Sequence, residues 1–222
     1  MSERQGLNYQ DSAYKTLSQL TPAEVMYLAS IHSDYPHKDI FLPSRAMVAT
    51  LAGFAANGLI RVVDKELQPI LPFQSLPSSE YERAILKRIA DGIIPAMYFE
   101  DLNLSEVLAD KGFLTAIPAR LLFFHFERYI PNLNAQGVID ELGELERRLT
   151  DAIEHNHQLE QFEAQMAHAL PHIAYTDRFK QYALGVGGAI AEAVKVKEFY
   201  FDKILPRVLD RRVAMSFDPL SY

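Results

Sequence analysis

One pattern that occurs twice in the first 130 residues constrains the fold more than any other feature of the sequence. In each copy a helix opens with a capping box, and a second helix ends at a glycine that an apolar strand follows. The second helix ends as FAANG at Gly58 in the first copy and as LADKG at Gly112 in the second. A glycine in the left-handed conformation stops a helix and turns the chain. The sequence therefore predicts two units, each with two helices followed by two strands.

Two such units have the layout of winged helices. We expect residues 20–75 to form the first unit, with its wing turn in DKELQ, and residues 76–130 to form the second, with its turn at IPAR. In the second wing, residues 113–117 would pair with 121–126. Residues 1–19 would form an N-terminal tail.

Residues 131–222 are expected to be a helical region. Apolar residues recur there every three or four positions, from Val138 to Ile153, which predicts an amphipathic helix of about five turns. Pro171 should interrupt the next helix. The last helices, over about 178–184 and 189–213, are rich in aromatic residues and should pack against the winged units. The predicted fold is therefore mainly α, with tandem winged-helix-like units and short β-hairpins packed on a C-terminal helical bundle as one compact domain.

Winged helices often bind DNA through an outward-facing second helix that carries Arg, Lys, Asn or Gln. From residue 44 to 57 the only charged residue is Arg45, and from 100 to 111 four acids stand against Lys111. The whole chain carries a net charge of -7, which repels phosphates. Nucleic acid is thus a disfavoured partner, and a winged-helix regulator of DNA or of another protein is kept as the alternative function.

No catalytic constellation stands out, so we expect a protein that is not an enzyme and needs no cofactor. The chain has no cysteine, which excludes disulfide frameworks, thiol nucleophiles and cysteine zinc sites. The GVGG segment at 185–188 follows a helix rather than a strand, so it predicts a helix break and not a phosphate loop. Four histidines, with Pro171 between the last two, make a second alternative of a metal-binding helical protein; these are His155, His157, His168 and His172.

The chain also lacks an apolar run of about 18 residues and an apolar N-terminal signal core, so we expect a cytoplasmic protein. One stretch is nevertheless unusually apolar. Residues 114–129 read LTAIPARLLFFHFERY, and alternation across the expected turn would make both faces of the second wing apolar. Either the C-terminal helices cover this hairpin, or it is an exposed patch for a partner, a second copy or a bilayer. In the second case the contact residues are Arg120, Leu121, Leu122, Phe123, Phe124, Phe126 and Arg128.

Basic residues gather near the C-terminus. Six of them against three acids lie between residues 195 and 212, so this stretch carries +3 and the remainder -10. An anionic partner should dock there. The candidate anion-binding residues are Arg45, Lys195, Lys197, Lys203, Arg207, Arg211 and Arg212.

Over about residues 20–155 the chain resembles the Golgi phosphoprotein-3 family and its bacterial relatives. The resemblance lies in LTPAEVMYLA, in ATLAGFAANGLIRV, and above all in VLADKGFLTAIPARLLFFHFERYIPNLNAQGVIDELGELERRLTDAI. Eukaryotic members are peripheral membrane adaptors that read a phosphoinositide head group and use the hairpin for membrane contact and self-association. The resemblance thereby implies such a role for residues 113–126.

The family's head-group pocket carries over poorly. The family uses a tryptophan and several arginines, whereas this chain has no tryptophan. Met97 and Glu100 stand about where two of those arginines are, and Arg45 lies near the third. A looser contact with an anionic surface or a protein is what remains implied. We therefore expect a homo-oligomeric, non-enzymatic adaptor at the inner membrane face, which contacts an anionic lipid surface or a partner protein through the hairpin.

Overall fold

The structure of the chain is a computed structural model, which describes residues 14–32, 42–73, 76–93, 102–121 and 124–207. The described chain is mainly helical, with two small antiparallel two-stranded sheets, as the sequence predicts. The elements are η2 (Leu17–Gln19), α1 (Pro22–His32), α2 (Leu42–Ala56), β1 (Ile60–Val63), β2 (Glu66–Pro69), α3 (Glu80–Ala90), α5 (Leu104–Asp110), β3 (Leu114–Leu121), β4 (Phe124–Pro131), α6 (Leu133–His155), α7 (Gln161–Met166), η3 (Ala167–Ala169), α8 (Pro171–Ala174), α9 (Asp177–Val186), α10 (Gly188–Phe199) and η4 (Tyr200–Ile204).

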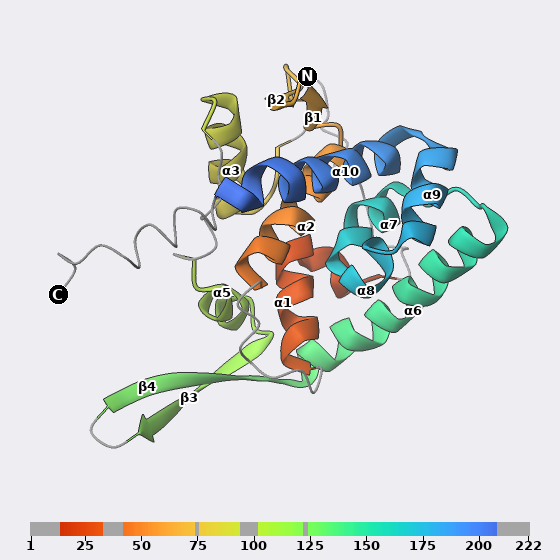
Figure 1. Cartoon of the computed structure of the whole chain (residues 1–222). Helices are drawn as coiled ribbons and strands as arrows, with labels where there is room; N and C mark the ends of the chain where they lie inside the picture. Colours follow the sequence, from red (N-terminus) through yellow and green to blue (C-terminus); the bar gives the residue numbers. More distant parts are fainter. Residues whose placement is uncertain (1–13, 33–41, 74–75, 94–101, 122–123, 208–222) are drawn as a thin grey trace, which may run out of the picture.

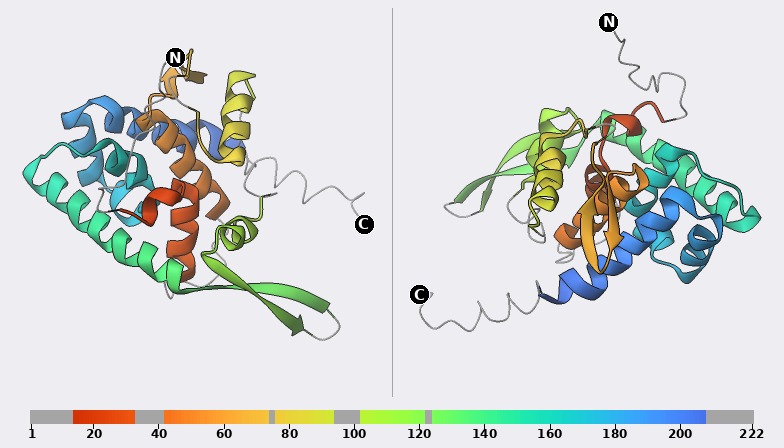
Figure 2. Two further views of the ribbon diagram at one scale, coloured as in Figure 1. Left: turned by 180° about the vertical axis from the view of Figure 1, so that it is seen from behind. Right: turned by 90° about the horizontal axis from the view of Figure 1, so that it is seen from above.

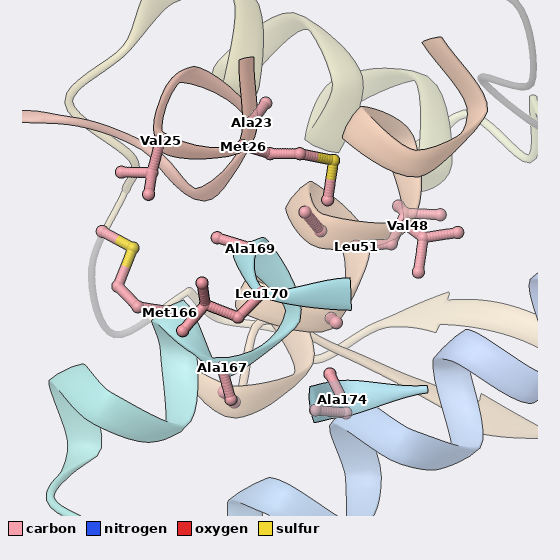
Figure 3. Close-up of a cluster of buried hydrophobic side chains, with 14 of the residues drawn as sticks. Ala23, Val25, Met26, Val48, Leu51, Met166, Ala167, Ala169, Leu170 and Ala174 are labelled. Atoms are coloured by element: carbon pink, nitrogen blue, oxygen red, sulfur yellow. The ribbon is translucent and has the colours of Figure 1, made fainter. Parts of the chain in front are cut away.

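Helix α2 is the centre of the molecule (Figure 1). Every residue from Ala46 to Ala56 is buried, because this segment is apolar all round and can only be stable inside a core. Gly53 lets α1 approach closely, since a Cβ at this position would lie 3.1 Å from Cγ of Pro22. Figure 3 shows the resulting cluster, in which Val48 and Leu51 of α2 lie among side chains of α1, α7 and η3. The segment from Ala46 to Ala56 is therefore part of the core and not of the surface.

Both predicted glycine stops are confirmed. Gly58 and Gly112 have positive φ of 66° and 77°, and each is followed by two buried residues that lead into a strand. In the first hairpin β1 pairs with β2 around Asp64 and Lys65, inside the predicted DKELQ turn. The two units of the repeat therefore share a local design, in which the first strand starts in the core and leaves it.

The predicted turn of the second hairpin is wrong. Pro118 lies inside β3 opposite Glu127, and the ladder continues until Leu121 pairs with Phe124. The proline is tolerated because each strand of a two-stranded ribbon has an unpaired edge. A turn at IPAR would have ended the ladder early, whereas the observed register pairs eight residues of each strand.

The β3–β4 ribbon, which we call the arm, projects from the helical body (Figures 1 and 2). Leu114 is buried at its base, and the residues from Thr115 to Pro118 are exposed. The prediction that the C-terminal helices cover this hairpin is therefore wrong for the residues described. Eight residues of extended chain span about 27 Å, so the far end of the arm lies well outside the core.

The C-terminal helices follow the predicted pattern. In α6 the residues Val138, Leu142, Leu145 and Leu149 are buried along one face. Pro171 begins α8, so it interrupts the chain of helices at the predicted point. Gly187 separates α9 from α10, which begins at Gly188, and both glycines have positive φ, so the glycine segment is a helix break.

Part of the expected N-terminal tail is packed on the body. Leu17 is fully buried, and the carboxylate of Glu141 on α6 accepts from the backbone N–H groups of Thr16 and Leu17 at 2.9 and 2.6 Å. The Tyr14 hydroxyl donates to Glu163 on α7 at 3.0 Å. Residues 14–19 thus belong to the same packed unit as the helices.

Candidate functional site

The arm has two different faces, which follow from its register. Directly opposite residues of an antiparallel pair share a face, and successive residues alternate. Ala119 stands opposite Phe126 and Ile117 opposite Arg128, so these pairs form one largely apolar face. For the described ladder the prediction that both faces are apolar is wrong, because pairing continues through Pro118 to Leu121 and so changes which side chains share a face.

The opposite face of the arm is polar. Arg120 pairs with His125 and Pro118 with Glu127. The Tyr129 hydroxyl donates to Oε2 of Glu127 at 2.9 Å, and this bond raises the pKa of Tyr129. The arm thus has one largely apolar face, which also carries Arg128, and a second face that carries Arg120, His125 and Glu127 beside Ala116 and Pro118.

The apolar face is open to solvent. Ile117 keeps 41% of its accessible surface and Phe126 keeps 49%. Arg120, His125 and Arg128 are exposed around them. The arm carries two arginines against one glutamate, although the whole chain has a net charge of -7. The arm therefore carries two exposed large apolar side chains with arginines beside them, while other such side chains are exposed elsewhere on the described chain, at Leu71, Leu76, Ile93, Leu133 and Leu184.

The base of the arm is held firmly by the body. Phe113 and Leu114 are buried in the core. The side-chain amides of Asn132 and Asn134 both donate to the carbonyl of Gly112, at 3.0 and 2.9 Å. One residue earlier in the chain, Nζ of Lys111 donates to Oε2 of Glu24 on α1 at 2.8 Å. Both strands of the arm are thus anchored where they leave the body, at the Leu114–Pro131 end of the ladder, and the contacts described above do not reach its outer half.

The predicted contact residues fall partly outside the described chain. Leu122 and Phe123 are not among the described residues, and for Leu121 and Phe124 only the backbone pairing is described. Phe126 is on the apolar face. Phe126, which is described, is therefore apolar like the LLFF sequence at 121–124 that precedes it.

The predicted anion-binding residues that the structure describes are in different environments. Lys197 is buried and donates to the carbonyl of Ala174 at 2.9 Å, and its burial lowers its pKa. Lys195 forms an ion pair with Glu192 at 2.5 Å. Arg45 is half-buried on α2. Lys203 and Arg207 do come together, in a cavity that Lys65 also lines.

Four other residues that the sequence pointed to lie outside the described ranges. They are Met97, Glu100, Arg211 and Arg212.

The four histidines are dispersed. His168 is fully buried, its ring stands edge-on to Phe179 with centroids 5.6 Å apart, and neither ring nitrogen has a hydrogen-bond partner among the described residues. His172 is exposed and lies 3.1 Å from Glu146, while His155 and His157 flank Asp151. Within the described ranges, no three His, Cys, Asp or Glu side chains lie close enough to hold a metal ion.

A pair of buried carboxylates was missed by sequence reasoning. Glu24 and Glu82 each belong to a predicted capping box, and in the fold both are buried near one another. Burial, followed by the nearby Glu24, raises the pKa of Glu82 to about 7. The sequence did contain a signal for this pair, because Glu24 and Glu82 hold the same position in the two copies of the repeat. An acid in the first helical turn is buried when its side of the helix faces the core.

Among the helices described, none is both long enough and apolar enough to cross a bilayer. Comparison of the chain with protein-family models, with curated proteins and with solved structures found no match.

Proposed function

We propose that this protein is a non-enzymatic peripheral adaptor that docks on an anionic membrane surface through the arm. The observation that carries the proposal is the exposure of Phe126 beside Ile117 on the apolar face of a projecting ribbon. The sequence at 121–124, of which the paired residues Leu121 and Phe124 are the ends, reads LLFF and is apolar throughout. Soluble proteins seldom expose contiguous apolar residues without a contact that covers them.

The charges around this face favour an anionic lipid surface as the occupant. Arg120 and Arg128 stand on opposite faces of the arm, so a tip that enters the interface carries a cation on each side of it. Each such residue near an anionic leaflet contributes about 1 kcal/mol, and burial of a phenylalanine side chain contributes about 2 kcal/mol. One arm therefore gives weak and reversible attachment, which suits an adaptor.

The helical body holds the base of the arm in place for this contact. We infer that the two repeats are tandem winged-helix-like units and that the arm is the enlarged wing of the second. The α2 helix, which would read DNA in such a unit, is enclosed in the core. The resemblance to Golgi phosphoprotein-3 in the arm sequence supports the same assignment and a site of action at the inner face of the membrane.

A second candidate function is self-association or capture of a partner protein. Among the described residues, β3 and β4 pair only with each other, so the ribbon has two open backbone edges. Open edges are templates for pairing with another strand. A homo-oligomer joined through the arms would also multiply weak membrane contacts.

Co-sedimentation with liposomes tests the proposal. We expect the protein to bind vesicles that contain anionic lipid, to bind neutral vesicles less, and to lose binding in Phe126→Ser. Leu184→Ser is the matched control, because Leu184 is 47% exposed on α9 and away from the arm. Equal binding by Phe126→Ser and the parent protein would refute membrane docking through the arm. A concentration-dependent mass in light scattering that Phe126→Ser abolishes, without vesicle binding, would favour the second candidate.

A further inference from the structure

A cavity away from the arm has a lining that the proposed function does not use. It measures about 420 Å³ and lies between the β1–β2 turn, the end of α3 and the last helical turns of α10 and η4. This volume is in the range of small-molecule sites in proteins. The residues that line it come from three segments that are distant in the sequence.

The rim of the cavity is cationic. Lys65 comes from the β1–β2 turn, and Lys203 and Arg207 come from the C-terminal end of the last helix. Glu66 is the one acid among the described residues of the lining. No ion pair within the described chain involves any of the three cations, whereas Lys195 on α10 pairs with Glu192 and Lys180 on α9 pairs with Glu198. The three rim cations are thus available to a ligand.

The wall of the cavity is apolar. Ile89 and Ile204 are buried core residues, and Phe199 packs against them. Ile93 lines the cavity too and keeps 52% of its surface exposed. The described lining contains no hydroxyl or amide side chain. Sugars and nucleosides need such groups for their hydroxyls and bases, so the lining disfavours them.

We propose that this cavity binds an anionic amphiphile. The carboxylate or phosphate head group lies between Lys65, Lys203 and Arg207, and the acyl chain lies against Ile89, Phe199 and Ile93. Charge-assisted hydrogen bonds at the rim hold the anion, and the apolar wall gives the tail a place out of water. Neither half of the lining alone would favour this ligand, since a bare anion leaves the wall uncovered and an uncharged tail leaves the cations unpaired.

The ligand has two possible sources, a lipid of the membrane or a free acyl anion. The figures bear on the first source, because α3, the end of α10 and the arm all lie toward the same side of the molecule in each view (Figures 1 and 2). A protein attached by its arm would therefore present the cavity to the same surface. This membrane source rests on the proposed function, whereas the cavity's preference for anionic amphiphiles does not.

Isothermal titration calorimetry with dodecyl phosphate below its micellar concentration tests the proposal, and it needs no tryptophan, which the chain lacks. Inorganic phosphate and dodecanol are the two half-ligand controls. We expect dodecyl phosphate to bind at least tenfold more tightly than either. The double variant Lys203→Glu/Arg207→Glu should weaken binding at least tenfold, and Ile93→Glu should weaken it as well.

Lys195→Glu is the matched control, because Lys195 is an exposed lysine on the same helix and does not line the cavity. It should change the affinity less than twofold. Absence of dodecyl phosphate binding, or equal loss in Lys195→Glu and in the double variant, would overturn the proposal.

Vesicle sedimentation then separates the two sources. If the double variant loses dodecyl phosphate and anionic vesicles together, the ligand is a membrane lipid. If it loses dodecyl phosphate alone, the ligand is a free amphiphile. Phe126→Ser should retain dodecyl phosphate binding in both cases, so failure of the arm as a membrane contact is distinguishable from failure of the cavity as a binding site.

Discussion

Lys111 Nζ donates to Oε2 of Glu24 at 2.8 Å, and this bond joins α1 to the residue just before the glycine from which the arm starts. The Glu24 carboxylate is fully buried, and its other oxygen has no hydrogen-bond partner among the described residues. A buried carboxylate needs its countercharge, so the position of the arm's base is tied to an ion pair that cannot be removed without cost.

We expect Lys111→Met to reduce the free energy of unfolding by about 2 kcal/mol. This value is smaller than that for a fully buried pair, because one third of the Lys111 side chain is exposed to screening water. Urea denaturation followed by circular dichroism measures it. Lys180→Met, which breaks an exposed ion pair with Glu198, is the control and should have a much smaller effect. Equal losses in the two variants would show that Glu24 does not depend on Lys111.

The raised pKa of Glu82 predicts that stability falls as the pH rises. The folded pKa is about 7 and the ordinary value is 4.5, so the folded state holds the proton more strongly. The stabilising contribution is complete below pH 4.5 and is lost as the pH rises through 7, at a slope of about 1.4 kcal/mol per pH unit. Glu82→Gln should therefore gain stability relative to the parent protein between pH 5 and pH 8 in thermal unfolding. Glu80→Gln, in the same helical turn but exposed, should show no such change.

Buried His168 predicts the opposite slope in acid. Burial, followed by the charge of Lys197, lowers the pKa of His168 to about 3 from 6.5. The unfolded chain binds a proton below pH 6.5 and the folded protein does not, so the stabilising contribution is present above pH 6.5 and is lost as the pH falls toward 3. His168→Leu should reduce this loss, and should not destabilise at pH 7, because it removes two unpaired ring nitrogens. An unchanged acid profile in His168→Leu, or the same change in exposed His172→Leu, would contradict this account.

Two glycine-to-alanine substitutions should have opposite signs. Gly112 has a φ of 77°, a conformation that an alanine adopts only with strain, so Gly112→Ala should destabilise by about 1 kcal/mol. Gly143 lies within α6 and a Cβ there would meet nothing within 4 Å, so Gly143→Ala should stabilise by about 0.7 kcal/mol. Chemical denaturation of both variants measures the difference. Destabilisation by Gly143→Ala would mean that α6 is packed differently from the structure described.

Membrane binding through the arm should depend on salt. Arg120→Glu/Arg128→Glu should lose most of its binding to anionic vesicles, and the remaining binding should no longer fall as ionic strength rises, because screened charges supply that dependence. Both residues are exposed on the arm, so unfolding in urea should change by less than about 0.5 kcal/mol. Reversal of Arg178 and Lys180 on α9, a helix on the other side of the molecule from the arm (Figure 1), is the control for a general loss of positive charge. If both double variants lose binding equally, the attraction is not specific to the arm.

Local signals predicted the elements of this fold well. The stops at Gly58 and Gly112, the Thr21–Glu24 capping box and the spacing of apolar residues in α6 each depend on a few neighbouring residues, and all are found in the structure. Of the second predicted box, only the bond from the Glu82 N–H to the Ser79 hydroxyl is found. The mainly helical class and the DKELQ turn followed from the same kind of evidence.

The arm shows where local signals fail. The IPAR segment has the residues of a turn, but the strand continues through Pro118, because extension of the ladder satisfies more backbone groups than an early turn would. The displaced turn then decides which side chains share a face, since a shift in register moves side chains to the other face. One side of the ribbon is largely apolar for that reason. Counting the apolar residues in the sequence could not have predicted which face they occupy.

The sequence by itself therefore determined the helices, their ends and the concentration of apolar residues in one hairpin, because those properties arise from residues close together in the chain. Only the tertiary structure decided that the arm projects, that Glu24 and Glu82 share a buried space, and that Lys65 meets Lys203 and Arg207 at one cavity. These relationships join residues far apart in the chain, and they exist only because burial of the apolar faces of the helices fixes how the elements pack.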